Sequence, residues 1–286
     1  MRVSFRRGGI AVTGMALCAI VLAACGSTTS INNASLPPTL TPAPANSITL
    51  DEETKLFRPF ITVVDANTRV TFINADTTTH NLKSVPITDP SEAAFVNPIK
   101  VANQVISGGT TKSLTFTRPG LYDLYDDTQA TIDTTYDRVA PNKDAAGFPY
   151  AAEAIIWVKG TVAGLPKASK NTVIAGNDIF GLDFVAVQTG GSIVWHDFDT
   201  DIHFVTMGPS FSGLNPAKIG DGVNKVLGTV DAPPKGGDIT LTFPTAGLYY
   251  YYCPAHADFD TFLNRAKSHG DASLFPIPMD GFVLVG

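Results

Sequence analysis

The residues with the clearest chemical potential lie near the end of the chain. Tyr249 to Tyr252 lead directly into Cys253, and His256 follows after two further residues. A thiol and an imidazole at this close spacing are typical of a metal-binding loop. The alternative is that Cys253 is a small, buried and inert side chain, which is common for cysteine in general.

The use of cysteine bears on this choice. The chain has three cysteines, and the other two, Cys18 and Cys25, lie close to the N-terminus. If both belong to an export signal and its processing site, Cys253 is the only remaining thiol and no internal disulfide can form. A lone thiol in an oxidising compartment is either buried or a metal ligand.

The N-terminus indicates export. Three arginines (Arg2, Arg6 and Arg7) precede an apolar run from Ile10 to Ala24 that is short for a membrane span. The run ends in small residues before Cys25, and it resembles a bacterial lipoprotein signal. The resemblance implies a signal peptide at 1–24, cleavage before Cys25 and lipid on its sulfur. An uncleaved transmembrane anchor is the alternative. Both place the rest of the chain outside the cytoplasmic membrane, in the periplasm or at the cell surface.

Residues 25–46 are expected to form a flexible tether, because they contain little apolar content and proline keeps such segments extended. The prolines of this stretch are Pro37, Pro38, Pro42 and Pro44. Without the three N-terminal arginines, 17 basic and 26 acidic side chains remain, a formal charge of −9. Nucleic acid is therefore excluded as an expected partner. An acidic surface could steer a basic protein partner.

The remaining chain contains an internal repeat. The matching pairs are 70–80 with 193–203, 114–116 with 241–243, 120–122 with 247–249, and Phe148-Pro149 with Phe275-Pro276. Matches of this length in the same order predict two homologous domains. We place them at 47–160 and 172–286, with a linker at 161–171 where Gly164, Pro166 and lysines interrupt the pattern.

Both copies read as all-β. Short apolar and β-branched runs recur between clusters of Gly, Pro, Asn and Asp, as in Ile61 to Val64, Phe184 to Val187 and Phe282 to Val285. This pattern predicts two tandem Greek-key β-sandwiches, each with a long insert before its last strand. The only helices expected lie in the inserts, such as Asp258 to Ser268. A sandwich by itself does not indicate a function.

The second copy resembles the cupredoxins, the family of blue-copper proteins that includes plastocyanin. The resemblance rests on Cys-x2-His after an aromatic strand, on His203 after a polar turn one strand pair upstream, and on Met279 opening the last strand. It covers residues 172–286 directly and residues 47–160 through the repeat. It implies a type 1 copper held by His203, Cys253 and His256, with Met279 as a weak axial ligand.

The residue types suit that implied chemistry. A thiolate and two imidazoles form a trigonal site that holds both Cu(I) and Cu(II), and a long thioether bond tunes the potential. In the family one histidine edge, here that of His256, reaches the surface and passes the electron. The alternatives to metal binding are that His203 caps backbone groups in a turn and that Met279 only fills the core.

One departure from the family concerns the axial position. An insert, Ala257 to Pro278, separates His256 from Met279, where the family has only a few residues. The insert could cover the copper or form a docking surface, and it brings Asp258 and His269 near the site in principle. Met207 is another axial candidate, although a β-strand would carry it away from the metal. His196 aligns with Ile73 in the repeat and is expected to be structural.

The first copy is expected to lack copper, so that the chain binds one type 1 copper. His80 aligns with His203, but Asp126 aligns with Cys253 and Gln129 with His256. The position of Met279 falls on Ala152 or Glu153. A carboxylate and an amide do not replace a thiolate and an imidazole for a metal that cycles between Cu(I) and Cu(II). A harder ion held by His80, Asp126 and Glu153 is the alternative, and the copy otherwise serves as a spacer or docking module.

The function expected from this resemblance is electron transfer by a membrane-tethered, extracytoplasmic carrier with redox protein partners. Copper nitrite reductases and multicopper oxidases need further histidines. This chain has five histidines, no His-x-His, and Tyr252 next to Cys253. Copper storage or delivery remains an alternative, although no Met- or His-rich cluster is present, and so does a non-catalytic copper subunit of a larger redox complex. A dinuclear copper site would need two loop cysteines.

Overall fold

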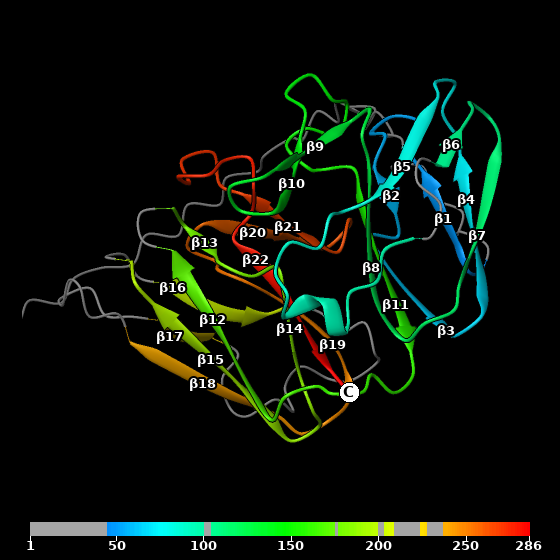
Figure 1. Cartoon of the computed structure of the whole chain (residues 1–286). Helices are drawn as coiled ribbons and strands as arrows, with labels where there is room; N and C mark the ends of the chain where they lie inside the picture. The colour runs from blue at the N-terminus through cyan, green and yellow to red at the C-terminus, as the bar shows by residue number, and fades with distance from the viewer. Residues whose placement is uncertain (1–44, 100–103, 175–176, 200–202, 209–223, 228–236) are drawn as a thin grey trace, which may run out of the picture. The chain divides into compact units, whose positions relative to one another are not determined.

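The computed structural model describes residues 45–99, 104–174, 177–199, 203–208, 224–227 and 237–286 (Figure 1). Residues Pro42–Gly286 form one compact unit. The expected signal peptide and most of the expected tether lie outside the described residues, so neither is tested. Within the described part of the chain, no helix has the length and apolar character needed to cross a membrane.

The first sandwich contains a four-stranded sheet of order β2-β1-β4-β7 and a five-stranded sheet of order β3-β11-β8-β5-β6. Their bounds are β1 (Ser47–Leu50), β2 (Phe57–Arg58), β3 (Ile61–Asp65), β4 (Thr68–Asn74), β5 (His80–Ser84), β6 (Gln104–Ile106), β7 (Thr111–Phe116), β8 (Gly120–Asp126) and β11 (Glu153–Lys159). A hairpin of β9 (Ala130–Asp133) and β10 (Arg138–Pro141) and the 3-10 turn η1 (Glu92–Ala94) complete it.

The second sandwich repeats this order strand by strand, as β13-β12-β15-β18 and β14-β22-β19-β16-β17. Its strands are β12 (Ala168–Ile174), β13 (Ile179–Phe180), β14 (Phe184–Val187), β15 (Gly191–Asp197), β16 (His203–Met207), β17 (Asn224–Leu227), β18 (Asp238–Phe243), β19 (Gly247–Tyr252) and β22 (Asp280–Val285). A second hairpin pairs β20 (Ala257–Asp260) with β21 (Arg265–Ser268). The expected all-β class is confirmed.

The expected linker needs one adjustment. Strand β12 starts at Ala168 and pairs in parallel with β15, so the last four residues of the segment 161–171 belong to the second sandwich. The lysines in this stretch suggested a break in the pattern. They are tolerated because β12 lies near the edge of its sheet, between β15 and the two-residue strand β13.

Burial alternates along two strands of the four-stranded sheet in the second sandwich, β15 and β18. Strand β15 alternates between buried and half-buried residues along its whole length, and β18 alternates between exposed and buried residues. The buried residues, including Ile193 and Trp195, pack against Tyr249, Tyr251 and Val283 of the facing sheet. One face of β15 and of β18 therefore contributes to the core, and the other face lies toward solvent.

The central strands are buried on both faces. In β19, Tyr249 and Tyr251 belong to the core of the second sandwich, whereas Tyr250 belongs to a separate apolar cluster. That cluster combines residues of both sandwiches, among them Phe60 and Trp157. The expected alternation of the four tyrosines is thus present, and both sides of the strand are covered.

The helix expected at Asp258 to Ser268 is wrong, because this segment forms the hairpin β20–β21. The Asp260 side chain accepts hydrogen bonds from the backbone N–H of Phe262 (2.8 Å) and Leu263 (3.0 Å), and Asn264 takes a positive φ of 53°. Such an Asx turn reverses the chain where a helix would continue. Asp133 and Asp137 make the same turn in the first sandwich.

Candidate metal centre

Three strands bring the expected ligands to one corner of the second sandwich. His203 opens β16, Cys253 directly follows β19, and Met279 directly precedes β22. The backbone N–H of Cys253 donates to the carbonyl of Met279 at 2.9 Å, which joins the ends of β19 and β22. His203, Cys253 and Met279 are each at most 1% exposed.

A tight turn returns His256 to Cys253. The backbone N–H groups of His256 and Ala257 both donate to the carbonyl of Cys253, at 3.1 and 2.9 Å. Cys253 Sγ then lies 3.6 Å from His256 Nδ1 and 4.0 Å from His203 Nδ1. The three donor atoms lie within 4.8 Å of one another, and the two imidazole centroids are 4.8 Å apart. One sulfur and two nitrogens therefore face a common centre.

This donor set fits copper. A soft sulfur with two imidazole nitrogens suits a metal that cycles between Cu(I) and Cu(II). The backbone N–H of Phe204 also donates to Cys253 Sγ at 3.3 Å. A hydrogen bond to a copper-binding sulfur withdraws charge from it and is one of the features that tune the potential.

The electrostatics favour neutral side chains until a cation binds. Burial raises the pKa of the Cys253 thiol, although backbone hydrogen bonds from Phe204, Ala255 and His256 oppose this effect. Burial and the neighbouring His256 lower the pKa of His203, so its imidazole stays neutral and able to bind a metal. A metal ion must therefore displace the thiol proton, which makes its affinity depend on pH.

The two methionine candidates lie in different places. Met279 packs in the same core cluster as Cys253 and is 1% exposed. Met207 ends β16, where it pairs with Tyr251, and it is only half-buried. The strand direction thus carries Met207 away from His203, as expected, and Met279 remains the predicted axial ligand.

Two carboxylates near the centre were missed from the sequence. Asp199 Oδ2 lies 3.4 Å from His203 Nε2, and Asp178 Oδ1 lies 3.3 Å from His256 Nε2. Each imidazole thus has a carboxylate beside Nε2, which orients the ring and leaves Nδ1 toward Cys253. Asp199 could have been found, because Asp76 precedes His80 by the same four residues in the repeat. Asp178 comes from the loop before β13 and carries no local signal.

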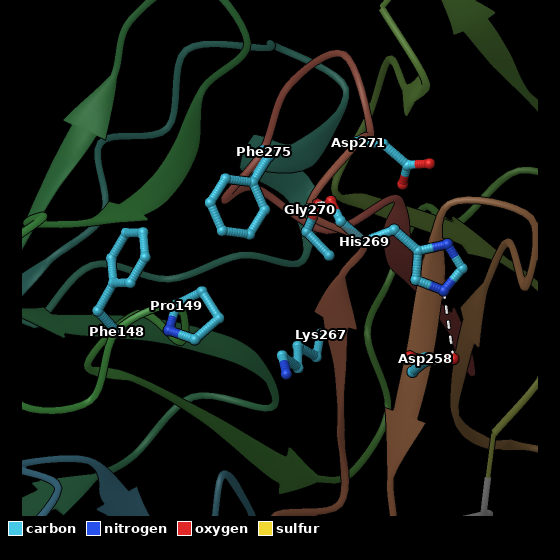
Figure 2. A pocket seen from close by; sticks show the side chains of 9 residues that line it. Phe148, Pro149, Asp258, Lys267, His269, Gly270, Asp271 and Phe275 are labelled. Carbon is cyan, nitrogen blue, oxygen red and sulfur yellow. Dashed lines mark hydrogen bonds and ion pairs between the residues drawn. The ribbon is translucent and has the colours of Figure 1, made fainter.

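The insert secures the loop that holds His256. His269 donates from its backbone N–H to the carbonyl of His256 at 2.9 Å, and its Nδ1 lies 3.0 Å from the carbonyl oxygen of Ala255. Its Nε2 faces Asp258 Oδ1 at 3.2 Å, as Figure 2 shows, beside an open pocket of about 520 Å³. His269 and Asp258 therefore pair with each other, and His269 holds the loop through the carbonyl groups of Ala255 and His256.

His196 has the structural place expected for it. It lies on the half-buried face of β15, makes an ion pair with Asp238, and packs its ring 4.1 Å from that of Phe198. None of these contacts involves the three converging donor atoms.

The corresponding corner of the first sandwich contains an ion-pair network. His80 Nδ1 contacts Asp126 Oδ2, and His80 Nε2 lies 2.9 Å from Asp76 Oδ2. Lys55 Nζ in turn lies 2.6 Å from Asp76 Oδ1. Burial alone would lower the pKa of His80, but hydrogen bonds with Asp126 and Asp76 outweigh it and raise that pKa. Here an imidazolium and a lysine neutralise the carboxylates.

The register at this corner also identifies the partner of Met279 in the repeat. The backbone N–H of Asp126 donates to the carbonyl of Ala152 at 2.9 Å, as that of Cys253 does to Met279. Ala152 is therefore the equivalent residue. The hard-ion alternative of His80, Asp126 and Glu153 is wrong as a set, because among the described residues Glu153 converges with Asp123 and Asp183, and not with His80 or Asp126.

Comparison with known proteins supports the family resemblance. Residues 45–127 match the copper-binding proteins of the plastocyanin/azurin family. The matched stretch lies in the first sandwich, which has Asp126 at the cysteine position, and not in the second. No curated protein sequence matches the chain.

Solved structures similar to this chain are also cupredoxins. A novel purple cupredoxin from Nitrosopumilus maritimus is 16% identical, with a TM-score of 0.27 over 40% of this chain and 98% of that one. Amicyanin from Paracoccus versutus is 14% identical, with a TM-score of 0.26 over 42% of this chain and 85% of that one. A mutant of amicyanin in its Cu(I) form is 18% identical, with a TM-score of 0.26 over 40% and 82%.

Proposed function

Because this chain is cupredoxin-like, with residues 45–127 matching the plastocyanin/azurin copper-binding family, we propose that it is an electron-transfer protein with one type 1 copper in its second sandwich. The family match supports a copper-binding role of the electron-transfer type. The observation that carries the finer proposal is the convergence of Cys253 Sγ with the Nδ1 atoms of His203 and His256.

The protein's own contribution is to hold the ligands in place. When bound, copper supplies a one-electron couple between Cu(I) and Cu(II). His203 and Cys253 lie at strand ends and are fully buried, so they exclude water and move little when the charge of the site changes. His256 keeps 15% of its side chain exposed and offers the edge through which a redox protein partner could exchange the electron.

The site favours a carrier over an enzyme. Apart from His203 and His256, the histidines of the described residues pair with carboxylates elsewhere, namely His80, His196 and His269. Among the described residues, none of these three lies in a group of converging metal ligands, as a second redox centre of the kind used by copper nitrite reductases or multicopper oxidases would require. Copper storage or delivery and a non-catalytic subunit role remain alternatives, which a measured electron-exchange rate would separate from the carrier.

A spectrum of the copper-loaded protein tests the proposal. We expect a strong absorption band near ~600 nm from the copper–thiolate bond, and one copper per chain by metal analysis. Electron paramagnetic resonance should give a single type 1 signal. A colourless copper-loaded protein, or two type 1 signals, would contradict the assignment.

We also propose that lipid on Cys25 anchors the protein to a bacterial membrane, with both sandwiches on the extracytoplasmic side. Cys25→Ser should then leave the protein unlipidated and free of the membrane, since the tether offers no other anchor. The measurement is the fraction that sediments with membranes. A mutant that still sediments would exclude lipid on Cys25 as the main attachment.

A further inference from the structure

Charged side chains are buried where the two sandwiches meet. Some of them, namely Glu153, Asp183, Asp280, Arg138 and Arg265, line a cavity of about 20 Å³, which is enough for one water molecule or one ion. The carboxylates of this group are Glu92, Asp123, Glu153, Asp183 and Asp280, and the guanidinium groups are Arg138 and Arg265. Five acids thus face two bases.

The two arginines neutralise part of this charge. Arg138 makes an ion pair with Asp183 Oδ1, and its Nη2 donates to the carbonyl of Phe180 at 2.7 Å. Arg265 Nη2 lies 3.3 Å from Glu153 Oε2, and its Nη1 donates to the carbonyl of Ala151 at 2.8 Å. Arg138 Nη1 also lies 4.0 Å from Asp280 Oδ1, so the two guanidinium groups reach Asp183, Asp280 and Glu153 but not Asp123.

Asp123 has no such partner. Its side chain is 2% exposed, and no N–H or hydroxyl group of the described residues donates to either carboxylate oxygen; its hydrogen-bond partner is the neighbouring acid Glu153. It nevertheless faces two other acids, because donor oxygens of Asp123, Glu153 and Asp183 all lie within 4.8 Å of one another. Three carboxylates at this spacing, two of them buried and the third half-buried, repel one another unless a proton or a cation lies between them.

The repeat shows that this arrangement is not required by the fold. In the second sandwich Tyr250 takes the place of Asp123, and its hydroxyl donates to Asp280 and accepts from the backbone N–H of Ala266. Phe60 takes the place of Asp183, and the guanidinium of Arg265 lies 4.1 Å from its ring centroid. In one half of the interface the aromatic side chains of Tyr250 and Phe60 contact the charged groups. In the other half, two additional acids, Asp123 and Asp183, take their places.

We propose that Asp123, Glu153 and Asp183 bind a hard divalent cation, and that Ca²⁺ fits best. Three oxygens within 4.8 Å of one another share a centre no more than roughly 2.8 Å from each, close to the ~2.3–2.6 Å of Ca²⁺–oxygen bonds. Mg²⁺ needs shorter bonds of about 2.0–2.1 Å and retains several waters, for which the cavity has little room.

The protonation of these acids agrees with this assignment. Burial, together with Glu153 and Asp183, raises the pKa of Asp123 well above its usual range. Burial likewise raises the pKa of Glu153 to about 8, against the opposing effect of Arg265. Without a cation these acids retain protons near neutral pH, and a divalent ion replaces that positive charge on binding. Binding would couple the two sandwiches, since Asp123 and Glu153 belong to one and Asp183 to the other.

Calcium binding to the full chain tests the proposal. Equilibrium dialysis with radioactive Ca²⁺ should give one bound ion per chain. Free Ca²⁺ at about 100 times Kd should raise Tm by roughly 5–10 °C relative to protein in chelator. Asp123→Asn keeps the shape of the side chain and should abolish both effects, whereas Glu92→Gln, a neighbouring acid outside the set of three, should preserve them.

The outcomes separate the cation from its competitor, a proton shared by Asp123 and Glu153. No bound Ca²⁺ on the unaltered chain would overturn the proposal in favour of the shared proton, even if Asp123→Asn fails to fold. Binding that survives in folded Asp123→Asn would place the ion elsewhere and overturn it as well. The proposal does not depend on copper, so the band near ~600 nm should be unchanged in Asp123→Asn.

Discussion

Strands β8 and β19 end at the same corner of their sandwiches, yet they present different side chains there. The backbone N–H of Asn81 donates to Asp126 Oδ1 at 3.0 Å, and that of Phe204 donates to Cys253 Sγ at 3.3 Å. The same amide therefore serves a carboxylate in one sandwich and a thiol in the other. Both corners also have a histidine at the start of the strand that lies beside β8 or β19 in the sheet, namely His80 in β5 and His203 in β16.

The difference lies in what balances the charge. At the first corner the carboxylate of Asp126 is balanced within the protein by His80, so no ion is needed. At the second corner no cationic side chain of the described residues contacts the thiol or the two imidazoles, and a metal would supply the positive charge. A candidate metal site and a structural ion pair can thus share one backbone, and three substitutions, at the positions of Cys253, His256 and Met279, separate them.

The largest expected effect comes from removing the thiol. Cys253→Ala should reduce bound copper from one per chain to none and abolish the band near ~600 nm, because no other thiol of the described residues reaches the corner. The sandwich should stay folded, which circular dichroism would verify. A type 1 signal that persists in this variant would mean that the first sandwich binds copper after all.

Removing the corresponding carboxylate should affect stability and not colour. Asp126→Ala leaves Nδ1 of the buried His80 and the amide of Asn81 without their carboxylate, and breaking such a buried pair costs about 3–5 kcal/mol. Urea unfolding measures the change in the free energy of unfolding. Asp258→Ala, at a side chain that is 79% exposed, is the control. Near-equal stabilities of the two variants would contradict a structural role for the pair.

The next effect concerns the carboxylate behind each histidine. Asp199→Asn should weaken copper binding by roughly 10–100-fold, since such groups orient the imidazole and raise its basicity. Asp76→Asn, the matching change in the first sandwich, should leave copper affinity unchanged. Competition with a copper chelator measures both. Equal losses in the two variants would show that the effect arises from the fold as a whole.

The axial position should change the potential more than the binding. Met279→Leu should keep the blue colour and raise the reduction potential by roughly tens of millivolts, because a weak donor to Cu(II) is lost and 59 mV corresponds to a tenfold preference. Met207→Leu should change it little. Voltammetry measures the potential. The opposite result would move the axial assignment to Met207.

The smallest expected effect is a pH dependence specific to the first sandwich. The raised pKa of His80 means that its pairing stabilises the fold fully below about pH 6.5 and loses this contribution as the pH rises through the raised value. The difference in the free energy of unfolding between the unaltered chain and His80→Gln should fall by on the order of 1 kcal/mol across that range. A difference that grows with pH would mean that His80 is neutral in the folded protein.

Much of this molecule can be predicted from its sequence. The repeat predicts two sandwiches of the same kind, because a local pattern of apolar and turn residues recurs in the same order. The spacing of Cys253 and His256 predicts a metal-binding loop, because the two residues between them form one tight turn that brings both side chains together. The helix expected in the insert is wrong, since a single Asp260 side chain bonded to two backbone amides reverses the chain.

Other features were decided only by the tertiary structure. Asp178 contacts His256 from a loop far away in sequence, and Asp123 meets Asp183 only where the two sandwiches pack. No local pattern encodes such contacts, because they depend on how whole sheets are placed. The sequence by itself therefore predicted which side chains could bind copper and in which repeat. Folding decided which carboxylates surround those histidines, since charge acts through space and not along the chain.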